Sequence, residues 1–175
     1  MNGMNMGTGR HPGSTSPSFG SVYVVTGEDL VGRGLRGLLE ANGFGVSGES
    51  QSVRHAERRN PALSPDLVVI DDDLPDGSGT ELCRTIAATD ATIRCVLMTG
   101  ETDQAALIGA ILAGAWGCFS QQDDNEEQLT LVRRAIQGYT AYSRRFETGI
   151  LAPTQADGTN GPDGHRGGGA RLRRP

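Results

Sequence analysis

Residues 65–79 read PDLVVIDDDLPDGSG, so an apolar run passes directly into a cluster of acids. The run LVVI at residues 67–70 contains no polar residue, which is typical of a strand in a parallel sheet that is covered on both faces. Asp71, Asp72 and Asp73 would then lie at the carboxyl end of this strand, where open α/β sheets bind their ligands. The stretch therefore predicts an α/β fold with a functional site beside residue 71.

Short apolar runs and segments of helical periodicity alternate on both sides of this stretch. Five such pairs in strict alternation indicate a parallel sheet joined by right-handed crossovers, with helices on both faces. Pro61 is expected to end the second helix. The expected strands are residues 22–25, 43–47, 67–70, 95–98 and 116–119, and the expected helices are residues 30–41, 53–60, 80–89, 103–113 and 125–137.

Composition divides the chain into one domain and two tails. Residues 20–146 carry the apolar patterns and have the size of a single domain, whereas the Gly-, Ser- and Pro-rich residues 1–19 and 147–175 are expected to be disordered. All 16 basic residues are arginine, and the net charge is −5 for the chain and −7 for residues 20–146. This acidic balance disfavours nucleic acid as the main partner.

Three cysteines and the absence of targeting segments bear on the compartment. Cys83, Cys95 and Cys118 lie in apolar contexts without metal-ligand spacing, which indicates free thiols in a reducing environment. No stretch is typical of a membrane span or of a secretory leader. We therefore expect a cytoplasmic protein.

Three segments of the domain resemble the receiver domain of bacterial response regulators. They are residues 65–79, the strand end at 97–99 and the run AILAGA at 110–115. The resemblance covers about residues 21–142 and implies a doubly wound, flavodoxin-like fold with a five-stranded parallel sheet in the order 2-1-3-4-5. It is greatest for regulators of the NarL/LuxR type, whose receiver is followed by a helix-turn-helix domain. No such segment follows residue 146, so a stand-alone receiver is expected.

The resemblance also implies a site for phosphoryl transfer. In such receivers an aspartate that ends the third strand accepts a phosphoryl group from a partner kinase, and Mg²⁺ and a lysine offset the charge that gathers there. The acceptor position falls on Asp71, a metal-binding backbone carbonyl on Asp73 and a phosphoryl-binding hydroxyl on Thr99. These three positions match the family pattern.

The cationic part of that site departs from the pattern. The acidic metal-binding pair after the first strand falls on Thr26 and Gly27, the lysine falls on Gln121, and the aromatic switch residue falls on Cys118. Asp71 remains as the only clearly placed carboxylate ligand, with Asp73 contributing weakly. We therefore expect weak Mg²⁺ binding and slow or absent phosphotransfer.

Some of these residues have alternative roles. Glu28 and Asp29 are either substitute metal ligands or, as we favour, caps or dipole partners of a helix N-terminus. Trp116 either packs half-buried against the fourth helix, which we favour, or serves as an exposed anchor for a partner. The acidic run at 71–73 is either a phosphoryl site, present or former, or a solvated turn without a chemical role.

The sequence thus predicts a degenerate receiver that is not an enzyme and acts by binding a sensor kinase or another regulator. Its binding face, which would also serve a homodimer, is expected at residues 103–137. One alternative is a working phospho-acceptor that holds Mg²⁺ with Glu28, Asp29 or Asp73. Another is a transcriptional regulator that binds DNA through the arginines of residues 171–174.

Overall fold

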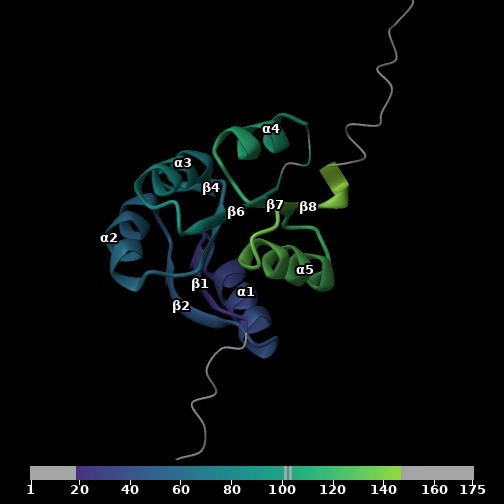
Figure 1. Cartoon of the computed structure of the whole chain (residues 1–175), viewed down its shortest axis with the longest axis horizontal. Helices are drawn as coiled ribbons and strands as arrows, with labels where there is room; N and C mark the ends of the chain where they lie inside the picture. Colours follow the sequence, from purple (N-terminus) through teal and green to yellow (C-terminus); the bar gives the residue numbers. More distant parts are fainter. Residues whose placement is uncertain (1–18, 101, 103, 147–175) are drawn as a thin grey trace, which may run out of the picture.

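The strand that carries the decisive sequence, β3 (Leu67–Asp71), lies inside a sheet of six parallel strands (Figure 1). The computed structural model describes residues 19–100, 102 and 104–146, and the predicted disordered tails lie outside these residues apart from Phe19. The strand order is β2-β1-β3-β6-β7-β8. The other strands are β1 (Ser21–Val25), β2 (Gly45–Ser50), β6 (Arg94–Thr99), β7 (Gly117–Ser120) and β8 (Ala141–Tyr142).

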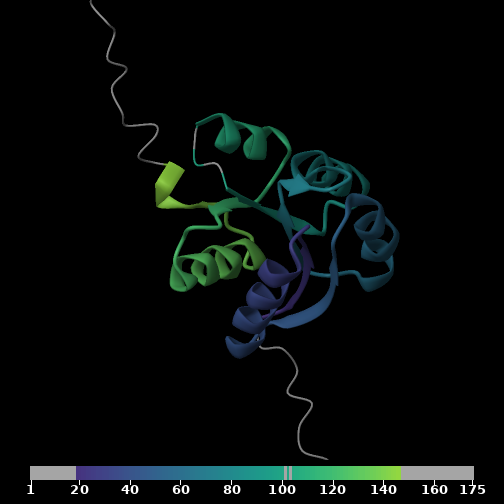
Figure 2. The ribbon, with the colours of Figure 1, turned by 180° about the vertical axis from the view of Figure 1, so that it is seen from behind.

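Helices cover both faces of the sheet, as predicted. Figures 1 and 2 show α1 and α5 side by side on one face, and the three remaining helices cover the other. None of the described helices is long and apolar enough to cross a membrane. The helices are α1 (Asp29–Ala41), α2 (Val53–Leu63), α3 (Gly79–Thr89), α4 (Gln104–Leu112) and α5 (Asn125–Ile136).

Side chains of β3 alternate between two apolar layers. Val68 and Ile70 pack with the cluster under α2, α3 and α4, and Leu67 and Val69 pack with the cluster under α1 and α5. All four are fully buried. The prediction that this strand is covered on both faces is therefore confirmed, as are the α/β class and the order of the five predicted strands.

The sheet has six strands, however, and the prediction of five was wrong. β8 extends the edge through the pairs Ala141 with Gly117 and Tyr142 with Cys118. A strand of two residues is too short to show a periodic pattern in the sequence. The same holds for the small antiparallel hairpin that follows β3, formed by β4 (Asp73–Leu74) and β5 (Gly77–Ser78).

Two predicted elements, the second helix and the second strand, have bounds that were wrong by two or three residues. The backbone of α2 continues through residue 61 to Leu63, so the proline does not end the helix at residue 60. β2 runs from Gly45 to Ser50, not from residue 43 to 47. Gly43 has a φ of +86° and the Phe44 N–H donates to the Leu39 carbonyl at 3.1 Å, so residues 43 and 44 close α1 instead of starting the strand.

Candidate functional site

The side chain of Asp71 lies at the carboxyl end of the sheet and is held by neutral hydrogen-bond donors. Its Oδ2 accepts from the Thr26 hydroxyl at 3.1 Å and from the Gln121 side-chain amide at 3.2 Å. Its Oδ1 accepts from the Asp73 N–H at 3.3 Å. Asp71 is only 3 % exposed, and none of the described residues forms an ion pair with it.

Burial controls the ionisation of this carboxyl. Removal from water raises the pKa of Asp71, and the bonds from the Asp73 N–H and the Thr26 hydroxyl lower it only in part. The negative charges of Asp73 and Glu28 raise it further. The pocket thus favours the uncharged form of Asp71 more than water does, whereas a cation would favour the charged form.

Parallel strands bring the two donor side chains to Asp71. Thr26 follows β1 and Gln121 follows β7, and both strands end at the same edge of the sheet as β3. The Thr26 hydroxyl also accepts from the Glu28 N–H at 3.3 Å, which leaves its proton for Asp71. The Gln121 N–H donates to the Thr99 carbonyl at 3.0 Å, so the buried Thr99 at the end of β6 anchors the backbone of Gln121.

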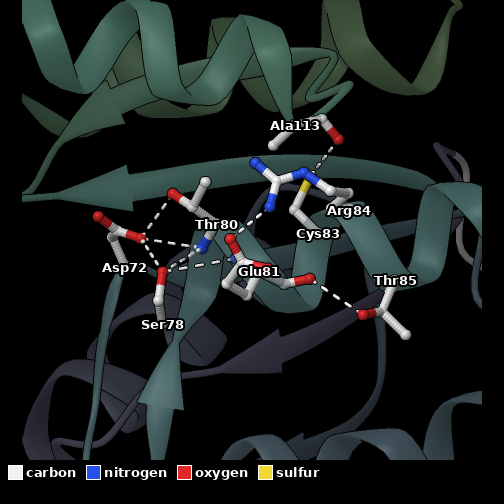
Figure 3. Close-up of polar contacts among 8 residues, drawn as sticks. All are labelled: Asp72, Ser78, Thr80, Glu81, Cys83, Arg84, Thr85 and Ala113. Carbon is white, nitrogen blue, oxygen red and sulfur yellow. Dashed lines mark hydrogen bonds and ion pairs between the residues drawn. The ribbon is translucent and has the colours of Figure 1, made fainter.

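Two other acids of the decisive stretch, Asp72 and Asp76, lie at the starts of helices and accept hydrogen bonds there. One carboxyl oxygen of Asp72 accepts from the Thr80 N–H at 2.9 Å, the Thr80 hydroxyl at 2.7 Å and the Ser78 hydroxyl at 3.2 Å, at the start of α3 (Figure 3). Asp76 accepts from the N–H groups of Val53 and Arg54 at the start of α2, and these bonds lower its pKa. Asp72 and Asp76 thus hold the loop that follows β3 against two helices.

The two acids after β1 differ in their contacts. Glu28 occupies the N-cap position of α1 but makes no side-chain cap bond, so its expected role as a cap is not seen. Asp29 lies in the first turn, as a dipole partner does, and pairs with Arg33. Within the described part of the chain, no three His, Cys, Asp or Glu side chains are grouped so that they could hold a metal ion. Mg²⁺ sites in proteins use one or two carboxylates with phosphate oxygens, so a metal here would depend on the Asp71 carboxylate, with Asp73 and Glu28 as the acids whose charges act on it.

Cys118, at the switch position, lies in the core. It is 1 % exposed, and burial raises the pKa of its thiol to about 12, with smaller contributions from the charges of Asp72 and Asp123. An aromatic ring lies one strand away, because Tyr142 of β8 pairs with Cys118. Sequence reasoning missed Tyr142 together with β8. All three cysteines are free thiols and buried, as predicted.

Trp116 is partly buried, but the prediction that it packs against the fourth helix was wrong. It packs with the cluster on the opposite face of the sheet, under α1 and α5. The Arg94 guanidinium lies 5.2 Å from the centre of its ring, a distance typical of a cation–π contact. Its predicted role as an anchor for a partner remains a prediction.

Comparisons with known proteins agree with the fold. The family model of the response regulator receiver domain matches residues 22–133. The chain is 36% identical over 132 residues to the DNA-binding transcriptional activator DevR/DosR of Mycobacterium tuberculosis. The aligned region covers 75% of this chain and 61% of that protein. It is 28% identical over 119 residues to the response regulator UvrY of Escherichia coli strain K12, over 67% of this chain and 55% of that protein.

A solved structure is similar over the same region. The LuxR-family two-component response regulator from Aurantimonas sp. SI85-9A1 superposes with a TM-score of 0.73 at 28% identity, covering 76% of this chain and 96% of that one. The chain spans 61% and 55% of the length of the two curated relatives above. The similarity therefore does not show that this chain has the activities of those whole proteins.

Proposed function

The chain belongs to the response regulator receiver domain family of two-component signalling, and from this premise we propose that it is a degenerate receiver that signals through protein binding. In this proposal Asp71 is phosphorylated weakly or not at all, and the domain catalyses no reaction of its own. Its partner is a sensor kinase or another regulator in the cytoplasm.

The observation that supports the proposal most is the neutral set of donors on Asp71. A phosphoryl group added to this carboxyl brings further negative charge into a pocket where burial already disfavours the charged form. The hydroxyl of Thr26 and the amide of Gln121 can donate hydrogen bonds to it, but neither supplies a positive charge. Phosphoryl transfer depends on cations that neutralise the charge developing on the transferred group.

The exposed face of α4 supports protein binding as the output. This helix contains no charged residue, and Ile108, Ile111 and Leu112 are 46%, 50% and 74% exposed. Exposed apolar side chains that lie together on one helix are typical of a binding surface. This helix belongs to residues 103–137, the range expected to bind a partner; residue 103 itself is outside the described residues.

Incubation with acetyl phosphate and Mg²⁺, followed by intact-mass measurement, tests the proposal. We expect no stoichiometric addition to the wild-type chain. The double variant Thr26→Asp/Gln121→Lys returns a carboxylate and an ammonium to the two positions beside Asp71, and we expect it to gain the phosphoryl mass. Asp71→Asn in the double variant should abolish the gain. Stoichiometric addition to the wild type that is lost with Asp71→Asn would overturn the proposal.

One observation favours a second candidate, a working phospho-acceptor in which Glu28 helps to hold the metal. The Glu28 carboxylate is not used as a helix cap, and its charge acts on Asp71. For this candidate, phosphorylation of the wild type should fall strongly in Glu28→Gln and remain in Asp29→Asn. The same mass measurement on these two variants separates it from the degenerate receiver.

A further inference from the structure

A groove of about 350 Å³ lies between α1 and α5, and Asp71 is not among the residues that line it. The α1 side is apolar and is formed by Val31, Leu35 and Leu38, and the buried Met98 of β6 lies at its base. Its volume lies within the range of small-molecule sites, which is about 300–1,000 Å³. None of the described side chains that line it is charged.

Amide groups form the polar side of the groove. Gln121, Asn125 and Gln128 contribute them from the end of β7 and from α5. The Gln128 amide N–H donates to the Asp123 carbonyl at 3.0 Å, and that of Gln121 donates to Asp71. These bonds fix the two amide groups and leave their carbonyl oxygens available as acceptors.

A glycine keeps the α1 side of the groove open. Gly34 lies inside a helix, where glycine is less favourable than alanine, and a Cβ added to it would meet no atom within 4 Å. Gly37 lies one turn further along the same helix, also with nothing within 4 Å, but it does not line the groove. A larger side chain at residue 34 would enter the groove, whereas the same side chain at residue 37 would not.

We propose that the groove between α1 and α5 binds an uncharged, mainly apolar small molecule that carries a hydrogen-bond donor. The apolar side buries the body of the ligand, and the fixed carbonyl oxygens of Gln121 and Gln128 accept from its donor. A charged ligand would lose its hydration without gaining a partner of opposite charge in the lining. The net charge of −7 on residues 20–146 further disfavours an anion.

Gln121 connects this groove to Asp71, because the same side chain lines the groove and donates to the carboxyl at 3.2 Å. A ligand that moves the Gln121 amide therefore changes a hydrogen bond of Asp71 directly. The groove would supply an input to the receiver that needs no phosphoryl group. The inference concerns a separate site, and it holds whether or not Asp71 is phosphorylated.

Fluorescence titration of the full chain with N-phenyl-1-naphthylamine tests the inference. This dye is uncharged and mainly apolar, carries one N–H donor and becomes brighter in apolar surroundings. We expect saturable binding at one site. Gly34→Leu should weaken it by about tenfold or more, and Gly37→Leu, the matched control, should leave it within about twofold of wild type. Both variants replace a helical glycine by a better helix former, so both are expected to fold.

Amide chemical shifts from NMR locate the dye. Shifts concentrated at Met98, Gln121 and Asn125 support the inference. It is overturned if the wild type shows no saturable binding, if Gly34→Leu binds as tightly as wild type, or if the shifts centre on α4. It is also overturned if the anionic relative 1-anilinonaphthalene-8-sulfonate binds equally well, or if binding weakens as protein concentration rises, since the groove would then be the contact between two copies of the chain.

Discussion

Gly79, the first residue of α3, lies against the backbone of Asp71 at the end of β3. We expect Gly79→Ala to destabilise the fold. A Cβ at this position would lie 2.1 Å from the Asp71 carbonyl oxygen and 2.8 Å from both the Asp71 carbonyl carbon and the Asp72 Cα. A close carbon–oxygen contact is about 3.3 Å, so the start of α3 must move away from β3 by about 1 Å. All three contacts are to backbone, which cannot turn aside as a flexible side chain can.

The magnitude follows from three effects. Overpacking of this kind costs about 1–3 kcal/mol. The movement also weakens the bond from the Gly79 N–H to the Asp72 carbonyl, which is 3.0 Å long, at a cost of about 1 kcal/mol. Alanine is more favourable than glycine in a helix by about 0.5–1 kcal/mol, which offsets part of this loss in the free energy of unfolding. We expect a net loss of about 2 kcal/mol.

Urea unfolding, followed by far-ultraviolet circular dichroism and by the fluorescence of Trp116, measures this loss as a lower midpoint with an unchanged slope. Gly37→Ala is the matched control, because it makes the same substitution in a helix where a Cβ meets nothing within 4 Å. It should gain about 0.5–1 kcal/mol. A Gly79→Ala variant as stable as wild type, or more stable, would refute the reasoning.

The remaining predictions concern Asp71 and α4. Because burial raises the pKa of Asp71 above its ordinary value of 3.8, its contribution to stability is fully present below pH 3.8 and is lost as the pH rises through the folded pKa. The free energy of unfolding of Asp71→Asn minus that of wild type should therefore be larger at pH 7 than at pH 3.5. Urea unfolding curves that give the same difference at both pH values would contradict the raised pKa of Asp71. Ile111→Gln should weaken any homodimer seen by sedimentation, whereas Leu30→Gln on α1, where the leucine is 79% exposed, should not; equal effects would argue against the α4 face.

Several features of the fold and site could be predicted because neighbouring residues determine them. The unbroken apolar run of β3 indicates a strand buried on both faces, and Val68 and Val69 do pack into opposite layers. The last helix begins with Asp124 as a cap that accepts from the Glu127 N–H at 2.8 Å and has Arg133 and Arg134 in its last turn. Such signals act within one or two turns of the chain, so the sequence displays them directly.

Other features depend on residues far apart in the chain. β8 forms because Ala141 and Tyr142 pair with the edge strand β7. Trp116 contacts Arg94 because β7 lies beside β6. Periodic patterns in the sequence do not indicate these contacts. The capping of α2 by Asp76 is similar, since the cap lies more than twenty residues after the helix start that it serves.

The order of acids and apolar runs along the chain was enough to establish the α/β class and the position of Asp71 at the end of a strand that is covered on both faces. The tertiary structure alone decided what surrounds that carboxyl: the hydroxyl of Thr26 and the amide of Gln121, residues 45 positions before it and 50 positions after it. The physical reason is that local patterns determine which segments become strands, whereas the alignment of parallel strands determines which side chains meet at their ends.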